Sequence, residues 1–324
     1  MNKKILHTLG WFLFFVLLAQ VAVPLARQDY YNLDIDKALW VKEKIFGNNL
    51  DYDTVFLGTS HTLTAVDPRI IAPAQAEKET ALNLAICWGG RNLYYIFARD
   101  LLENHRVKNL VLEICSDKPS HDFHPAYRFY CNTSDVFTGP PLPVQMFALY
   151  HKEEFTTRVA DICAAMLKPA VIFLRAEFAT PKTPSSRLNE RLGFDPLEHP
   201  VDMAEKVSYA FSLDPARVDK SNDERYFFEP SYKDWFSYIK KISQLAQKSG
   251  TRVYILYLPS RNYPIPPDGL TKELSSYGTL VIPDLQKIYR HDLWYDDGHL
   301  NSKGAVVLSE DLSTRFKDYW AQKD

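Results

Sequence analysis

The chain is short of cysteine and has no long run of like charge, and both shortages exclude classes of protein. Its 324 residues carry 38 Lys and Arg against 40 Asp and Glu, a formal net charge of -2. Without a long basic run there is no electrostatic footprint for nucleic acid, so nucleic acid is not an expected partner. The four cysteines, Cys87, Cys115, Cys131 and Cys163, form no CxxC pair and no zinc-ligand spacing. The sequence therefore indicates neither a metal site nor a thioredoxin-like motif, and it predicts no cofactor.

One long apolar segment lies near the N-terminus. Residues 9–25 contain no charge, and Lys3 and Lys4 precede them. Residues 5–26 are long enough for a membrane-crossing helix of about 20 residues, and the lysines favour a cytoplasmic N-terminus. A cleaved signal peptide is the alternative, but the residues before position 26 make a poor small-x-small cleavage site. We therefore expect residues 1–27 to be a single-pass anchor in the cytoplasmic (inner) membrane.

The anchor predicts the compartment of the remaining chain. Everything beyond it should face the periplasm or the cell exterior. An oxidising compartment permits up to two disulfides among the four cysteines. Buried free thiols are the alternative.

Past the anchor, short apolar runs alternate with helical patterns. Runs at 54–57, 81–86 and 110–114 are typical of parallel strands buried on both faces, and helical patterns at 34–46 and 92–104 flank them. The rhythm resumes with a helix at 232–248, strands at 253–258 and 280–282, and a helix at 304–319. This order predicts a doubly wound α/β sheet with its ligand crevice beyond the carboxyl ends of the strands.

Between the two halves the strand and helix rhythm stops. Residues 118–230 hold most of the Pro-rich and aromatic sequence, with helical candidates at 153–167 and 203–211. Neither a repeat nor a low-complexity tract occurs there. We therefore expect one domain, residues 28–324, with a large insertion at about 118–230 that shapes its site.

A serine and an Asp-x-x-His turn are both predicted at the crevice edge. Ser60 follows the strand at 54–57, although a Gly-Thr-Ser turn alone is more often a helix cap or a loop. Asp296 and His299 are separated by two residues, so the carboxylate can fix one imidazole nitrogen while the other takes a proton from serine. A surface histidine in an acidic loop is the alternative. Taken together, the three predict a triad with Ser60 as nucleophile.

These motifs resemble the blocks of the SGNH, or GDSL, hydrolase superfamily. Gly58-Thr59-Ser60 resembles the first block, with Thr59 in place of the usual Asp. Residues 296–304 resemble the last block, Asp-x-x-His followed by Leu-Asn-x-x-Gly, and residues 83–90 resemble the second. The resemblance implies a flavodoxin-like three-layer sandwich and esterase, lipase or acyltransferase chemistry. It also implies oxyanion donors at the backbone N–H groups of Gly89 or Gly90 and of Thr59 or Ser60.

The third block departs from that superfamily. Leu112-Glu113-Ile114-Cys115-Ser116-Asp117 stands where many members carry Gly-x-Asn-Asp, so no Asn is present as a third oxyanion donor. Loss of one such donor costs on the order of a hundredfold in rate, so the site either recruits a substitute or is a weaker catalyst.

Three further residues are weaker candidates for substrate binding. His61 follows the nucleophile and is expected to point to solvent from the first helical turn. Trp88 and Arg91 flank the candidate oxyanion glycines and could contact a sugar or an anion. Their alternatives are core packing for the tryptophan and a surface ion pair for the arginine.

An anchor joined to such a domain resembles the extracytoplasmic proteins of alginate acetylation and teichoic acid D-alanylation. The resemblance implies acyl (acetyl) transfer to a cell-surface or secreted polysaccharide through an acyl-Ser60 intermediate. A multi-spanning membrane acyltransferase is the implied partner. An esterase acting on a carbohydrate or lipid is one alternative, and a catalytically silent scaffold for a membrane acyltransferase is another.

Overall fold

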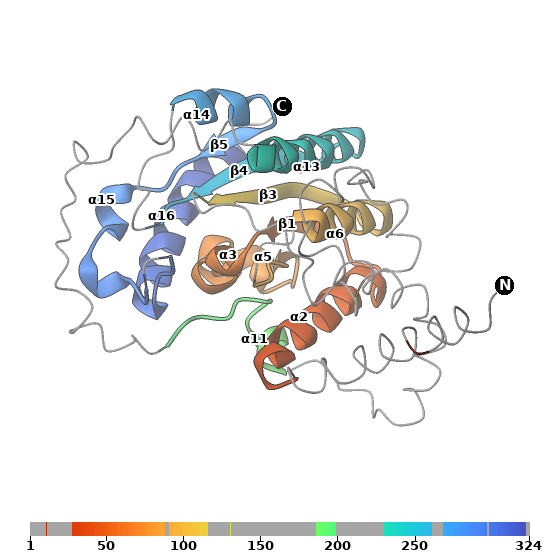
Figure 1. Ribbon diagram of the computed structural model, residues 1–324, viewed down its shortest axis with the longest axis horizontal. Coiled ribbons are helices and arrows are strands. Elements are labelled where there is room, and N and C mark those ends of the chain that lie inside the picture. Colours follow the sequence, from red (N-terminus) through yellow and green to blue (C-terminus); the bar gives the residue numbers. More distant parts are fainter. Residues whose placement is uncertain are drawn as a thin grey trace. The chain divides into compact units, whose positions relative to one another are not determined.

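A parallel five-stranded sheet forms the centre of the fold (Figure 1). Its strands are β1 (Tyr52–Leu57), β2 (Ala81–Asn83), β3 (Val107–Cys115), β4 (Arg252–Leu258) and β5 (Thr279–Val281). They lie in the order β2-β1-β3-β4-β5, and each adjacent pair is parallel. This is the doubly wound, flavodoxin-like order, in which the winding reverses between β1 and β3. The predicted α/β class with a parallel sheet is therefore confirmed.

The structure, a computed structural model, describes residues 11, 28–87, 91–115, 130, 186–198, 230–260, 268–296 and 298–321. The chain divides into two compact units, residues 1–39 with 125–183 and residues 40–124 with 184–324. The second unit contains the sheet. Of the first unit, the structure describes Trp11, Tyr130 and the beginning of helix α2 (Gln28–Phe46).

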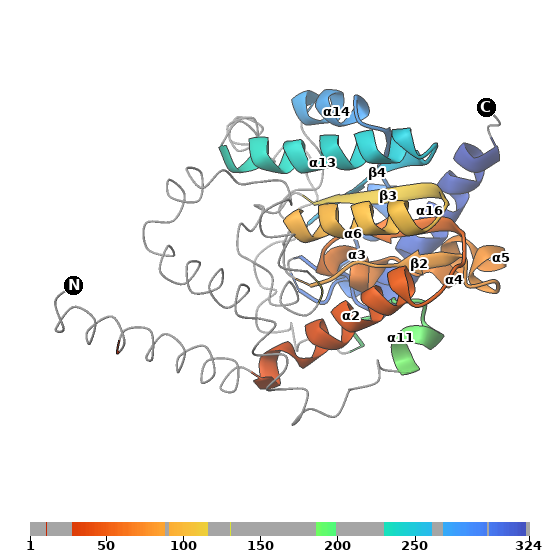
Figure 2. The ribbon, with the colours of Figure 1, turned by 90° about the vertical axis from the view of Figure 1, so that its right-hand side faces the viewer.

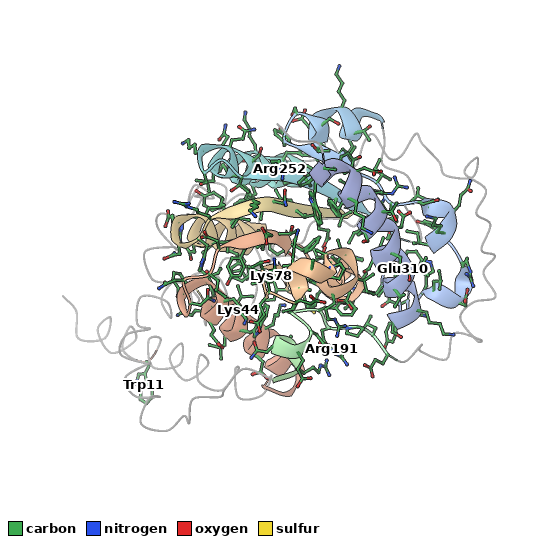
Figure 3. All side chains as sticks on the ribbon, turned by 180° about the vertical axis from the view of Figure 1, so that it is seen from behind. Trp11, Lys44, Lys78, Arg191, Arg252 and Glu310 are labelled. Atoms are coloured by element: carbon green, nitrogen blue, oxygen red, sulfur yellow. The ribbon has the colours of Figure 1, made fainter. Side chains whose placement is uncertain are left out.

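Helices cover both faces of the sheet because its strands are apolar on both sides. On one face lie α6 (Arg91–Asn104) and α13 (Pro230–Lys248) (Figure 2). On the other lie α3 (Ser60–Ala65), α4 (Pro68–Ile71) and α16 (Ser302–Ala321), whose buried Phe316 packs edge-on against Phe56 of β1. The outward side of α16 carries exposed residues such as Glu310 (Figure 3). The remaining short helices are α5 (Pro73–Ala76), α11 (Ser186–Glu190), α14 (Asp268–Ser275), α15 (Leu285–Ile288) and the 3-10 turn η2 (His291–Leu293).

Part of the predicted insertion packs directly on this framework. The carbonyl of Leu192 accepts a 2.9 Å hydrogen bond from the N–H of Asn83, which lies on the edge strand β2. The indole N–H of buried Trp40, on α2, donates to the Asn189 side chain at 2.8 Å. Residues 186–198 therefore contact the framework at the end of β2 and at α2.

Several predicted segments lie outside the described residues. Among those that are described, no helix is both long and apolar enough to cross a membrane. Of the predicted anchor, residues 5–26, the structure describes only Trp11. The helical candidates at 153–167 and 203–211 also lie outside the described residues. The anchor and the domain boundaries remain predictions.

Candidate active site

Ser60 lies at the carboxyl end of the sheet, at the point where its winding reverses. It is the first residue of α3 and follows β1 after Gly58 and Thr59. The Thr59 hydroxyl caps this helix by accepting the backbone N–H of His61 at 3.2 Å. Ser60 is partly exposed, while both of its neighbours are buried. Crevices at such switch points bind ligands in doubly wound sheets, and this is where a nucleophile can meet one.

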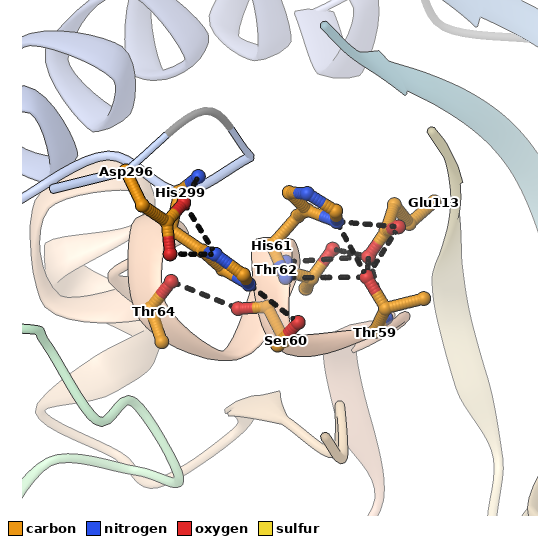
Figure 4. Close-up of polar contacts among 8 residues, drawn as sticks. All are labelled: Thr59, Ser60, His61, Thr62, Thr64, Glu113, Asp296 and His299. Atoms are coloured by element: carbon orange, nitrogen blue, oxygen red, sulfur yellow. Dashed lines mark hydrogen bonds and ion pairs between the residues drawn. The ribbon is translucent and has the colours of Figure 1, made fainter. Parts of the chain in front are cut away.

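The three side chains predicted as a triad are hydrogen bonded in series (Figure 4). The Ser60 Oγ atom lies 2.7 Å from Nε2 of His299, although 239 positions separate them in sequence. Nδ1 of the same ring lies 2.9 and 3.0 Å from the two carboxylate oxygens of Asp296. The structure therefore brings together all three residues.

The protonation state of Asp296 determines the tautomer of the histidine. Partial burial alone raises the pKa of this carboxyl, but the hydrogen bond and charge of His299, with the backbone N–H groups of Gly298 and His299, outweigh burial and lower the pKa to about 2. Asp296 is therefore ionised at neutral pH and only accepts hydrogen bonds. The proton in the hydrogen bond between Asp296 and His299 is therefore on Nδ1 of the histidine. The lone pair of Nε2 is left to accept the hydroxyl of Ser60.

The Asp-x-x-His turn is held by its own backbone. Trp294 and Leu300 form an antiparallel bridge, and the Asp296 Oδ1 atom accepts the N–H groups of Gly298 at 2.8 Å and His299 at 2.7 Å. The turn thus closes on its own carboxylate.

The Leu-Asn-x-x-Gly tail that follows joins the turn to α16. Asn301 caps the helix by accepting the N–H of Gly304 at 3.0 Å. A Cβ atom at Gly304 would lie 2.2 Å from the carbonyl oxygen of Leu293, so only glycine fits. The tail seats α16 against the segment that leads into the turn.

Glu113 of β3 is a site residue that the sequence did not reveal as one. Its side chain is fully buried and its Oε2 atom accepts the backbone N–H of Thr59 at 2.5 Å. Thr59 or Ser60 was expected to offer an N–H to the oxyanion, and the Thr59 N–H does not serve because it is already bonded to this carboxylate. A lone acid inside the apolar run at 110–114 was the available signal.

The structure also places His61 differently from its expected position. It was expected to point to solvent, but it is only 7% exposed. Its ring stacks on that of His299 with a centroid separation of 4.7 Å and an interplanar angle of 9°. His61 follows Ser60 on a helix that packs inward, so it supports the histidine of the triad instead of contacting solvent.

The other predicted site residues are not tested by this geometry. Trp88, Gly89 and Gly90 lie outside the described residues, as does the side chain of Arg91. Within the described part of the chain, no group of three or more His, Cys, Asp or Glu side chains could hold a metal ion.

Comparisons with known proteins add little to this picture. No family model and no curated protein matches the chain. A solved structure from Streptococcus pneumonia, provisionally described as a platelet activating factor, is similar at 12% identity with a TM-score of 0.34, over 93% of this chain and 98% of that one. A TM-score that low carries no argument. The fold assignment therefore rests on the sheet order, and the site rests on its own geometry.

Proposed function

We propose that the chain is a serine acyl-transfer enzyme in which Ser60 accepts an acyl group as an ester. The observation that carries the proposal is the series of hydrogen bonds from Ser60 through His299 to Asp296, at 2.7 Å and 2.9 Å. A hydroxyl within hydrogen-bond reach of a base, which is itself oriented by a carboxylate, is the arrangement that activates a serine nucleophile. Its position at the carboxyl edge of the sheet supports the same reading.

The first half of the reaction forms the acyl-enzyme. Nε2 of His299 takes the Ser60 proton while Oγ attacks the acyl carbonyl, and the tetrahedral intermediate collapses as the imidazolium returns the proton to the leaving group. Asp296 stays ionised throughout and stabilises the imidazolium.

The second half transfers the acyl group onward. An acceptor hydroxyl gives its proton to His299 and attacks the acyl-serine carbonyl. Ser60 recovers its proton when the new ester leaves. Water in the acceptor position gives hydrolysis, so transferase and esterase share every protein group named here.

Of the two neighbouring N–H groups considered for the oxyanion, only that of Ser60 is left. The N–H of Thr59 is bonded to Glu113. In the proposed mechanism the Ser60 N–H and that of Gly89 or Gly90 stabilise the oxyanion. Because each donor contributes on the order of a hundredfold in rate, this site is expected to be sensitive to the loss of either.

The acceptor we propose is a hydroxyl of a cell-surface or secreted polysaccharide, with acetyl as the acyl group. The resemblance to extracytoplasmic acyl-transfer proteins and the predicted anchor support that choice. They also support a multi-spanning membrane acyltransferase as the source of the acyl group. The esterase is the second candidate, and it is favoured by the partial exposure of His299, whose side chain is 25% accessible and open to water.

The test is the fate of an acyl group supplied to the purified full chain. Turnover of a chromogenic acetyl ester is followed with and without an added oligosaccharide, and acetylated sugar is measured by mass. Transfer predicts that sugar is acetylated at the expense of free acetate, whereas an esterase releases acetate alone.

Two variants accompany that test. Ser60→Ala must remove both products. Ser275→Ala changes a serine on α14 whose hydroxyl bonds the Thr271 carbonyl, so it should behave as wild type. Full turnover by Ser60→Ala would end the proposal.

A further inference from the structure

Glu113 is a buried carboxylate directly beneath the turn that carries Ser60. Its side chain has no exposed surface. An ionised carboxylate taken out of water costs several kcal/mol unless hydrogen bonds and charges compensate it. The hydrogen-bond donors around Glu113 therefore indicate what its carboxylate does in the fold.

Those groups lie on both sides of the nucleophile. The backbone N–H groups of Thr59 and Thr62 reach the Glu113 Oε2 atom at 2.5 and 3.2 Å. The hydroxyl of Thr59 donates to Oε1 at 2.8 Å, and that of Thr62 donates to Oε2 at 2.7 Å (Figure 4). One carboxylate from β3 thus fixes the backbone immediately before Ser60 and two residues after it.

The same carboxylate determines how the His61 ring is held. The Thr59 hydroxyl has one proton and donates it to Glu113, so at 2.9 Å from this oxygen His61 Nδ1 must be the N–H donor. The ring is thereby tied to Glu113 through Thr59. Since this ring stacks on His299, the carboxylate orients a surface against which the catalytic base rests.

Gly58, which follows β1, leaves no free space beside the Glu113 carboxylate. A Cβ atom at Gly58 would lie 2.3 Å from both the Glu113 Oε2 atom and the Thr62 hydroxyl oxygen. Glycine at this position is therefore required for the carboxylate to approach the turn.

We propose that Glu113 is the positioning residue of the active site, and this rests on the proposed function. Its carboxylate holds the Thr59 to Thr62 turn so that Oγ of Ser60 meets His299, and through Thr59 it holds His61 as the support of the imidazole ring. It does not touch the reacting atoms. Its contribution is to kcat, because displacement of a nucleophile by about 1 Å can cost on the order of a hundredfold in rate while leaving substrate binding unchanged.

The first test replaces the carboxylate by an amide of the same shape. In Glu113→Gln the side chain keeps one acceptor oxygen, but its NH2 group takes the place of the other and faces a donor, so the contact with the Thr59 hydroxyl or those on the Oε2 side are lost. We expect kcat for a chromogenic acetyl ester to fall about tenfold to a hundredfold with KM within about twofold, and Ser60 labelling by a fluorophosphonate to slow in parallel. Asp311→Asn is the matched control, because Asp311 is also a buried carboxylate but pairs with Lys287 and Arg315. It should lower stability and leave kcat unchanged.

A second pair keeps the proposal testable if Glu113→Gln does not fold. Thr62→Ser retains the hydroxyl that donates to Glu113, and Thr62→Val removes it with little change of shape. We expect Thr62→Ser to have the kcat of wild type and Thr62→Val to have a lower kcat, with KM similar in both.

The outcomes separate the two proposals. Wild-type protein that fluorophosphonate does not label at Ser60 would overturn the proposed function, and this inference with it. Labelled wild type, with folded Glu113→Gln or Thr62→Val protein that matches it in kcat, would overturn the positioning role alone. A loss of kcat that is fully explained by a smaller fraction of folded protein would also overturn the positioning role.

Discussion

At the residue scale, two hydrogen-bonded groups meet at one pair of stacked rings. Ser60, His299 and Asp296 form the first group, and Glu113 with its threonines and His61 forms the second. The rings of His61 and His299 lie face to face between them. The second group constrains where the atoms of the first group lie, so substitutions in the second group should lower kcat less than removal of Ser60 itself.

Removal of the nucleophile and of its orienting acid should have unequal effects. Ser60→Ala should abolish acyl transfer with folding intact, because Ser60 forms the covalent bond itself. Asp296→Asn should cause a smaller but still large loss, because His299 can still act as a base without its carboxylate. Steady-state kinetics of the single and double variants measures both. Losses that simply add in the double variant would contradict the account, since members of a triad act as a unit.

The depressed pKa of Asp296 makes a prediction about acid stability. This pKa falls from its ordinary value of 3.8 to about 2 on folding, so the ionised group stabilises the folded chain. A lowered folded pKa gives stability that is fully present above about pH 4 and is lost as the pH falls towards 2. The difference in thermal midpoint between wild type and Asp296→Asn should follow that window. A difference that stays constant from pH 6 to about pH 2 would count against the ion pair.

The sequence predicted the triad residues but not their support. An Asp-x-x-His turn and a serine after a strand are local patterns, and the edge of a parallel sheet brings them together. Glu113 makes its contacts 54 positions away, across neighbouring strands, and no local pattern specifies that partner. For the same reason the Thr59 N–H was assigned to an oxyanion: the sequence does not show which acceptor a backbone N–H will meet.

At the element scale, the strands were predictable because parallel strands buried on both faces are continuous apolar runs. The predicted strand at 81–86 ends at Asn83, although the chain continues beside β1 through bonds from Leu84 and Ile86. The insertion was harder, since residues 186–198 contact the framework through single backbone and side-chain hydrogen bonds. Such contacts have no periodicity for a sequence to display.

The junction between the Asp-x-x-His turn and α16 depends on Gly304. In Gly304→Ala the new Cβ would lie 2.2 Å from the Leu293 carbonyl oxygen, so we expect a loss of about 1–3 kcal/mol in stability. The turn should shift with it and activity should fall. Chemical denaturation and ester turnover measure the two effects.

Gly269→Ala is the matched control for that prediction. Gly269 is also a helical glycine, but a Cβ there meets no atom within 4 Å. The substitution should leave activity unchanged and stabilise the protein by up to about 1 kcal/mol. Equal destabilisation by both substitutions would contradict the close approach at Gly304.

At the scale of the whole molecule, the proposed function requires the active site to lie outside the cytoplasm. A reporter that is active only outside the cytoplasm, fused after Asp324, should be active in cells. Deletion of residues 1–27 should silence it, because those residues are the predicted anchor. Activity of a reporter that works only in the cytoplasm would overturn both the topology and the compartment.

The central claim concerns one covalent bond, and mass measurement of the Ser60 peptide tests it most directly. The full chain is incubated with an activated acetyl ester, quenched in acid and digested. The account predicts a peptide containing Ser60 that has gained the mass of one acetyl group. The corresponding peptide of Ser60→Ala should not contain it. An acetyl group found only on other residues, or no adduct while the ester is consumed at the wild-type rate, would contradict the account.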